Sequence, residues 1–269
     1  MRKHLTLDAY GAKNLHLDDI KYINNVLNKV IYELKLDPVT PPQLIPYYYG
    51  KVKEDIGVTA YMLLEGGHIT IHTFPLRECY FVDLYVPQNF DDQKALELFH
   101  ELLPYKNDLS IVEVVDRDQK DLESYEYDPN TDFGPHIMNE IMTKDAPSME
   151  TLYDFLENFV TKINMDPITR ANVQKSTVVK PKYLSGIIII AQSHVALHYS
   201  YKTKTIMADV FSCAPFDFSY MKEFYKVLGE TTSDRLISRG SKHIYKVKSK
   251  IKKDDLRAST RWQKAMKLK

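Results

Sequence analysis

The sequence predicts an α+β fold in which one structural unit occurs twice in tandem, each copy placing its helices on one face of a largely antiparallel sheet. Three observations lead to this prediction. Two stretches of the chain match each other without a gap, and both copies contain the same order of helical and strand-like segments. The composition is that of a globular protein, since 44% of the 269 residues are hydrophobic and 12% are aromatic.

The repeat is clearest where residues 65–87 (EGGHITIHTFPLRECYFVDLYVP) are aligned with residues 191–213 (AQSHVALHYSYKTKTIMADVFSC). The offset is 126 residues throughout this alignment. Further matches upstream have offsets of 129 and 132, which indicates two small insertions in the first copy. A chance similarity of short motifs is the alternative interpretation. The matched pairs include His68 with His194, His72 with His198, Asp83 with Asp209, and His4 with His136.

The first predicted element in each copy is an amphipathic helix. Apolar residues recur at helical spacing after Asp18 and Asp19 in the first copy, and after Pro147 and Ser148 in the second. Both patterns end near a proline, which cannot continue a helix. The periodic residues are Ile20, Ile23, Leu27, Val30, Ile31 and Leu34, and then Leu152, Phe155, Leu156, Phe159, Val160 and Ile163.

Three strand-like runs follow each helix, rich in β-branched and aromatic residues. A second helix is predicted from Asp91 and Asp92 in the first copy, and from near Asp217 in the second. A last strand then closes each unit, at residues 109–115 and near residues 243–247. The three runs are VTAYMLL, HITIHTF and CYFVDLYV in the first copy, and SGIIII, HVALHY and TIMADVFS in the second.

These elements divide the chain into four segments. Residues 1–117 form the first copy and residues 133–247 the second. Between them, residues 118–132 contain six acidic residues against one lysine and read as an exposed linker. The lysine-rich tail, residues 248–269, is interpreted as a solvated or frayed segment without an assigned function.

Composition narrows the class of protein. The 36 Lys and Arg residues balance 36 Asp and Glu residues, so no basic field predicts nucleic acid or an anionic membrane as a partner. No apolar segment is long enough to span a bilayer, and the N-terminus turns polar too early for a signal peptide. Two cysteines, Cys79 and Cys213, suit a reducing compartment. A cytoplasmic protein with a small-molecule substrate is expected.

Two familiar site types fit the residues poorly. His194 and His198 would lie about 13 Å apart along one strand, too far to share a metal ion, so no metal is expected. A hydrolase triad of Ser193, His198 and Asp209 lacks the glycine-flanked serine turn that exposes such a nucleophile.

The segments SGIIIIAQSHVALHY and MADVFSC resemble the processing region of the bacterial-type S-adenosylmethionine decarboxylase family. The start of the chain, RKHLTLDAYGAKNL, is similar to that family's start, so the resemblance covers nearly the whole chain. Members are made as inactive precursors that cut themselves before a serine and convert it to a pyruvoyl group. The resemblance implies a cut between Gln192 and Ser193, with pyruvate formed from Ser193 as the cofactor and no metal.

The resemblance also implies roles for the neighbouring residues. The Ser193 hydroxyl would attack the Gln192 carbonyl, and elimination from the resulting ester requires a base and oxyanion donors. His198 is then the processing base and Ser185 supports processing. The finished ketone would bind the substrate amine as a Schiff base and accept the electrons released with carbon dioxide. Cys213 would reprotonate the product, although a small buried hydrophobic residue is the alternative interpretation of that cysteine.

The first copy lacks this chemistry. Gly67 and Pro87 stand in the places of Ser193 and Cys213. Duplication and fusion explain this, with one site lost. The eukaryotic members that the chain resembles in this respect form an αββα sandwich, and we expect the same architecture here. The two chains left by self-cleavage are expected to stay associated, and the sequence leaves open whether a homodimer forms.

The substrate-binding motif departs from the family's pattern. The family's HTWPE is HYSYK here, so Lys202 occupies the place of a glutamate that contacts ribose hydroxyls. A cation cannot accept those hydrogen bonds. Three hypotheses follow: an S-adenosylmethionine decarboxylase of polyamine (spermidine) biosynthesis, a pyruvoyl-dependent ornithine or arginine decarboxylase, and a relative that never cleaves itself and has a structural or regulatory role.

Overall fold

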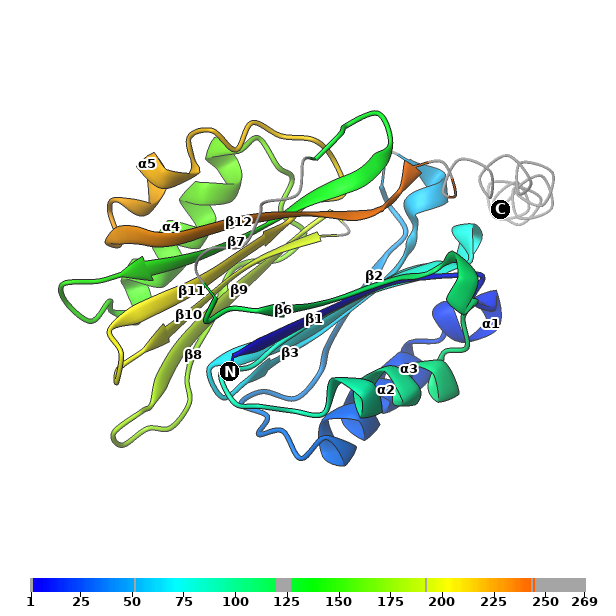
Figure 1. The fold of residues 1–269 in the computed structure, drawn as a ribbon, viewed down its shortest axis with the longest axis horizontal. Coiled ribbons are helices and arrows are strands. Elements are labelled where there is room, and N and C mark those ends of the chain that lie inside the picture. Colours follow the sequence, from blue (N-terminus) through cyan, green and yellow to red (C-terminus); the bar gives the residue numbers. More distant parts are fainter. Residues whose placement is uncertain (1, 51, 120–126, 192, 243, 245–269) are drawn as a thin grey trace, which may run out of the picture.

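Two six-stranded antiparallel sheets pack face to face in the computed structural model, with helices on their outer faces (Figure 1). The structure describes residues 2–50, 52–119, 127–191, 193–242 and 244. This arrangement confirms the predicted αββα sandwich of two tandem units. Among the described residues, no helix is long and apolar enough to cross a membrane.

The two sheets have the same topology. The first has the strand order β2-β3-β4-β5-β1-β6, and the second has the order β8-β9-β10-β11-β7-β12. The first-sheet strands are β1 (Lys3–Tyr10), β2 (Gln43–Tyr47), β3 (Gly57–Leu64), β4 (Gly67–Phe74), β5 (Cys79–Tyr85) and β6 (Ile111–Asp116). Those of the second are β7 (Asp132–Met142), β8 (Asn172–Lys175), β9 (Tyr183–Ile190), β10 (Ser193–Ser200), β11 (Thr205–Phe211) and β12 (Glu230–Ser241).

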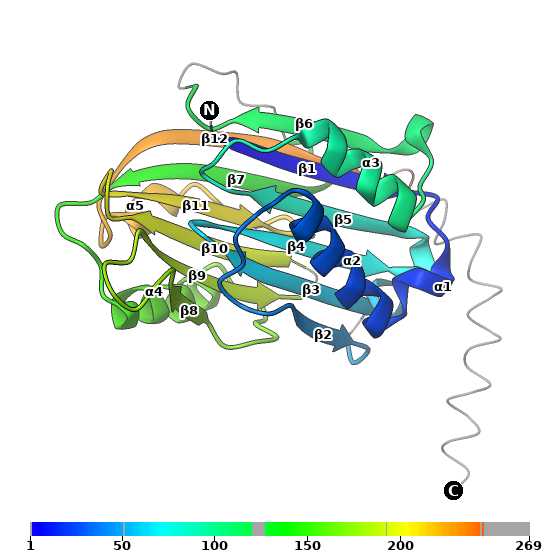
Figure 2. The same ribbon diagram turned by 90° about the horizontal axis from the view of Figure 1, so that it is seen from below.

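The three longest helices begin at the caps that the sequence predicts, whereas the second helix of the second copy begins at Met221, four residues after Asp217 and without a side-chain cap. The carboxylate of Asp19 accepts a hydrogen bond from the Tyr22 backbone N–H at the start of α2 (Ile20–Glu33). Ser148 does the same for α4 (Met149–Lys162). α2 and α3 (Asp92–Leu102) lie on the outer face of the first sheet (Figure 2). The remaining short helices are α1 (Asn14–Leu17), α5 (Met221–Tyr225), η1 (Lys53–Asp55), η2 (Pro75–Arg77) and η3 (Asn107–Leu109).

The closing strand of the second copy is a correction to the sequence prediction. The strand is β12, Glu230–Ser241, rather than a run near residues 243–247, most of which lies outside the described residues. Its sequence, ETTSDRLISRGS, is polar because β12 is an edge strand with one partly exposed side. The acidic segment 118–132 lies between β6 and β7, and the tail 248–269 lies outside the described residues.

Two kinds of layer hold the fold together. On each outer face, aliphatic and aromatic side chains of a sheet form one buried cluster with those of its helices; the first cluster includes Leu27 and Val30 of α2 and Ile69 of β4. Each large side chain buried in this way contributes about 1.5–3 kcal/mol of stability. The layer between the sheets is different. It is apolar near its ends but holds charged and imidazole side chains at its centre.

Candidate active site

Ser193 is the first residue of β10, immediately after the turn from β9. Its side chain is buried, and its Oγ accepts a hydrogen bond from the Cys213 backbone N–H at 2.7 Å. The Cys213 thiol in turn donates to the carbonyl oxygen of Ala191 at 3.2 Å. The structure therefore brings Ser193 and Cys213 together at the predicted cut. Gln192, the residue on the other side of that cut, lies outside the described residues.

The surroundings of Cys213 keep its thiol protonated. Burial raises the pKa of the thiol to about 11, although the hydrogen bond with Ser193 opposes the shift. Asp55 and Arg77 of the first copy lie close enough to influence that pKa. A neutral thiol at physiological pH can donate a proton, which a thiolate cannot.

Ser185 and His198 lie together, but not with Ser193. They are partners across the β9–β10 pair, and Ser185 Oγ is hydrogen-bonded to His198 Nδ1 at 2.9 Å. Ser193 is five residues from His198 along β10, a distance of about 16 Å in a strand. Within one chain, the His198 side chain is therefore at the wrong end of β10 to act on Ser193.

The first copy supplies an equivalent pair at the Ser193 end. Thr59 and His72 correspond to Ser185 and His198 at the offset of 126, and Thr59 Oγ1 is hydrogen-bonded to His72 Nδ1 at 3.0 Å. His72 Nε2 lies 3.1 Å from Nδ1 of His194, the residue after Ser193. Sequence reasoning missed this pair, although the repeat contained the signal.

The arrangement is reciprocal. His198 Nε2 lies 2.8 Å from Nδ1 of His68, the residue after Gly67. The His72 and Thr59 pair of the first copy thus lies near the start of β10, and the His198 and Ser185 pair of the second copy lies near the start of β4. One of those starts carries Ser193, and the other carries Gly67. The two ends of the layer therefore correspond through the repeat: one carries the predicted site residues Ser193 and Cys213, and the other, called the depleted end or depleted site below, carries Gly67 and Pro87.

Six histidines occupy the layer between the sheets, each at most 1% exposed. Three buried aspartates, Asp8, Asp83 and Asp209, lie among them together with two arginines, Arg117 and Arg239. Arg117 Nη1 donates to Asp209 Oδ1 at 2.6 Å and lies 3.0 Å from His4 Nδ1. Arg239 Nη1 lies 3.1 Å from His136 Nδ1 in the same way. Sequence reasoning missed both arginines because no motif marks them. The histidines are His4, His68, His72, His136, His194 and His198.

Burial sets the charge of this layer. It lowers the pKa of His68, His72 and His136 well below 6.5 and that of His198 to about 3. These rings are neutral at physiological pH. Burial opposes ionisation of Asp83, but the imidazoles around it hold the pKa of that carboxyl well below its usual range.

The same layer contains potential metal ligands that the sequence argument did not consider. Three combinations place ligand atoms within 4.8 Å of one another: His4, Asp83 and His136; His68, Asp83 and His194; and His68, His198 and Asp209. Both carboxylates already face a guanidinium group, since Arg239 Nη1 lies 3.8 Å from Asp83 and Arg117 binds Asp209. The absence of a metal stays a prediction, which considered only His194 and His198.

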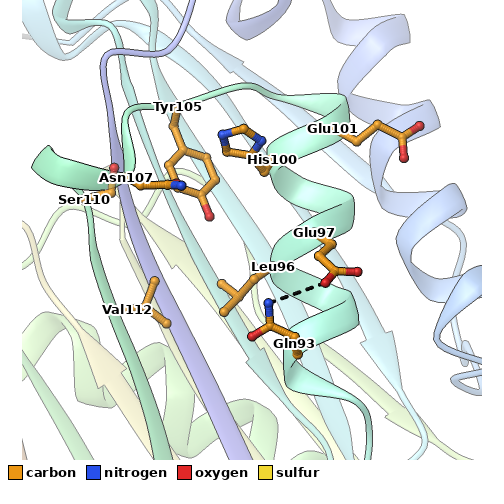
Figure 3. Close-up of a pocket in the computed structure, with 9 residues that line it drawn as sticks. All are labelled: Gln93, Leu96, Glu97, His100, Glu101, Tyr105, Asn107, Ser110 and Val112. Carbon is orange, nitrogen blue, oxygen red and sulfur yellow. Dashed lines mark hydrogen bonds between the residues drawn. The ribbon is translucent and has the colours of Figure 1, made fainter.

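Lys202 lies far from Ser193. It lines a cavity of about 350 Å³ at the opposite end of β10, together with Gly66, Pro87 and His198. A separate open hollow of about 470 Å³ lies between α3 and β6 (Figure 3). Its lining includes His100, Tyr105 and Val112, and none of the predicted site residues.

Comparison with known proteins agrees with this organisation. The family model described as S-adenosylmethionine decarboxylase matches residues 3–117 and again residues 136–232. Two curated proteins from strains of Clostridium kluyveri, each named S-adenosylmethionine decarboxylase proenzyme, are 28% identical to the chain over 118 residues. Each alignment covers 40% of this chain and 88% of the relative. The two family matches, one to each copy, show that this chain belongs to the S-adenosylmethionine decarboxylase family, whose members are carboxy-lyases.

Proposed function

We propose that the chain cuts itself between Gln192 and Ser193, converts Ser193 to a pyruvoyl group, and then decarboxylates S-adenosylmethionine for polyamine (spermidine) synthesis. The observation that carries the proposal is the meeting of the Ser193 hydroxyl, the Cys213 thiol and the Ala191 carbonyl at one turn. A neutral imidazole from the first copy lies beside the next residue, His194.

Processing requires a nucleophile and a base. The Ser193 hydroxyl attacks the carbonyl carbon of Gln192, and the amide becomes an ester as the Ser193 nitrogen leaves that carbon. A base then removes the Ser193 α-proton, and the Gln192 carboxylate departs from the β-carbon. The dehydroalanine hydrolyses to the ketone and releases ammonia. The backbone N–H of Cys213 donates a hydrogen bond to the attacking oxygen and holds it in place.

We assign the base to His72 rather than to His198, because only His72 is at the Ser193 end of the layer. Its lowered pKa keeps the ring neutral and able to accept a proton. Thr59 is a positioning residue, since its hydroxyl fixes Nδ1 of His72. His198 and Ser185 face Gly67, where no hydroxyl exists.

Replacing His72 with glutamine is expected to stop processing after the ester forms. The chain then stays in one piece on a neutral gel, but hydroxylamine cuts the ester and yields a fragment that begins with an unblocked serine. His198→Gln is the matched control and should cut at a rate within about threefold of the wild-type rate. Loss of cutting in His198→Gln with normal cutting in His72→Gln would return the role to His198. Gel time courses measure the rate of cutting in both variants, and the mass of the smaller fragment shows whether its N-terminus is a free serine.

During turnover, the pyruvoyl ketone supplies an electron sink for the decarboxylation. The protein's part is then to bind the amino acid, exclude water and return a proton to the substrate carbon. Cys213 is suited to the last step because its thiol is protonated at neutral pH.

Cys213→Ala should therefore cut normally but turn over at least about a hundredfold more slowly, a range typical of a lost general acid. Carbon dioxide release per fully cut chain measures the effect. Cys79→Ala, which removes a buried thiol in the first copy, is the control and should retain most activity. Equal turnover in both variants would leave Cys213 as a packing residue.

The second candidate function is decarboxylation of ornithine or arginine. Lys202 is remote from Ser193, and its counterpart in the first copy is Leu76, next to Arg77. Neither residue accepts hydrogen bonds from a ribose as a glutamate does. Carbon dioxide release from S-adenosylmethionine, L-ornithine and L-arginine under identical conditions decides between the two candidate functions.

The proposed cut does not divide the fold into separable parts. It separates β1–β9 from β10–β12, yet β10 lies between β9 and β11 in the second sheet. β7 likewise stays paired with β11 and β12 across the two fragments. The fragments are therefore expected to remain associated through complete strand ladders.

A further inference from the structure

The depleted end of the layer between the sheets still contains a cavity. Its volume of about 350 Å³ falls within the range of small-molecule sites. The two copies both contribute to it, just as both surround Ser193. Gly66 and Pro87 come from the first copy, while Tyr183, His198 and Lys202 come from the second. A site that had merely lost its function could have been filled by larger side chains, but this space remains.

Tyr183 shapes one wall of the cavity. Its ring lies flat against Gly66, close enough that a Cβ on Gly66 would be 2.7 Å from a ring carbon. The counterpart of Tyr183 at the Ser193 end is Gly57. The two ends of the layer therefore differ in shape, because the ring of Tyr183 forms a wall at the depleted end where the Ser193 end has only the backbone of Gly57. Tyr85 and Met207 extend this wall.

Charges of both signs line the same cavity. The Glu140 side chain is only 10% exposed, and a single oxygen, Oε1, is bonded to Arg2 at 3.1 Å. That arginine is shared with Asp118, which it contacts more closely at 2.6 Å. Lys202 has no ion-pair partner among the described residues, and three aliphatic hydroxyl groups accompany it in the lining. They belong to Ser200, Thr203 and Thr205.

A ligand that satisfies this lining carries an amino group for Glu140 and a carboxylate for Lys202. Charge-assisted hydrogen bonds of this kind are the strongest that a cavity wall can offer. A simple polyamine would leave Lys202 facing a cation, and a simple acid would leave Glu140 facing an anion. Under the proposed function, on which this choice of ligand rests, the cavity is the repeat counterpart of a site for an amino-acid substrate.

From these observations we infer that the cavity between Gly66, Glu140 and Lys202 is a second, non-catalytic site for a zwitterionic α-amino acid. The ligand binds through its α-amino group at Glu140 and its α-carboxylate at Lys202, with its side chain against Tyr85 and Tyr183. No bond is made or broken, because Gly67 provides no hydroxyl from which a ketone could form.

The test uses the full-length Ser193→Ala chain, which cannot form a ketone, so its outcome is independent of self-processing. Calorimetric titrations with S-adenosylmethionine, L-ornithine and L-arginine are expected to show saturable binding of at least one. For that amino acid, Lys202→Met and Glu140→Gln should each weaken binding about tenfold or more. Lys204→Met, an exposed lysine of the same hairpin outside the cavity, is the matched control and should bind as the parent does.

Ligand variants complete the test. The amine made by removing the carboxylate of the bound amino acid should bind at least about tenfold more weakly. Three results would overturn the inference: no saturable binding of any of the three amino acids, binding that is indifferent to Lys202→Met and Glu140→Gln, or an amine that binds as tightly as its parent amino acid. An uncut wild-type chain would contradict the proposed function but would leave these titrations valid.

Discussion

A Ser193→Ala chain is expected to remain a single polypeptide of 269 residues, whereas the wild-type chain yields fragments of 192 and 77 residues. The reason is chemical. Alanine has no oxygen to attack the Gln192 carbonyl and no leaving group for elimination, so neither step of processing can occur. Because an ordinary peptide bond is stable for years in neutral water, the expected effect is a complete loss of cutting rather than a partial one.

Intact mass and a denaturing gel measure this result. The smaller wild-type fragment should also resist N-terminal sequencing, because a ketone replaces its amino group. Ser219→Ala, an exposed serine in the same copy, is the control and should be cut like the wild type. A wild-type chain that stays intact after purification and incubation would refute self-processing and favour the structural or regulatory hypothesis. A Ser193→Ala chain that is cut would place the scissile bond elsewhere.

Much of the fold could be predicted because its signals are local. The helices follow from apolar spacing and from capping residues such as Asp19 and Ser148. The prediction omitted the first strand of each copy, β1 and β7. Both are inner strands with two buried faces, and one face holds polar residues such as His4 and His136. β1 still alternates polar and apolar residues from His4 to Ala9, a strand signal that the prediction did not use, whereas β7 shows neither a simple alternation nor a continuous apolar run.

The sequence could predict only those parts of the candidate site whose residues all come from the second copy. The antiparallel pairing of β10 with β11 places Cys213 beside Ser193, and the family motif includes both residues. The choice between His72 and His198 depends on how the two sheets face each other, which no spacing within one copy reveals. A motif taken from a family whose members resemble half of this chain cannot tell which copy contributes which residue. The length of β10 favours His72, because five residues of this strand separate Ser193 from His198 at the other end of the layer.

The depleted site is also fixed in its present form by the backbone. A Cβ on Gly67 would lie 1.9 Å from the carbonyl oxygen of Tyr85, so no side chain fits without moving β4 away from β5. Reintroducing serine at that position would require this movement before any chemistry could follow. Glycine at position 67 allows β4 to approach β5 closely, and this close approach in turn leaves no room for a serine side chain.

Acid is expected to destabilise the fold strongly, by about 5 kcal/mol between pH 7.5 and pH 5.5. Burial lowers the pKa of four histidines below the ordinary value of 6.5, so the folded state binds no proton there while the unfolded state does. Their contribution to stability is therefore fully present above about pH 7 and is lost as the pH falls below 6.5. Each of these histidines lowers the free energy of unfolding by about 1.4 kcal/mol between pH 7.5 and pH 5.5. The four are His68, His72, His136 and His198.

The measurement is urea unfolding of the uncut Ser193→Ala chain at the two pH values, because a single chain makes the unfolding reaction unimolecular. His68→Gln should reduce the pH-dependent difference by about 1.4 kcal/mol, since one proton fewer is taken up on unfolding. His100→Gln, which changes an exposed side chain on α3, should leave the difference unchanged. Equal stability at pH 7.5 and pH 5.5 would mean that the buried rings titrate in the folded state. In that case a neutral His72 could not be relied on as the processing base at acidic pH, so the same titration constrains both the stability of the layer and its chemistry.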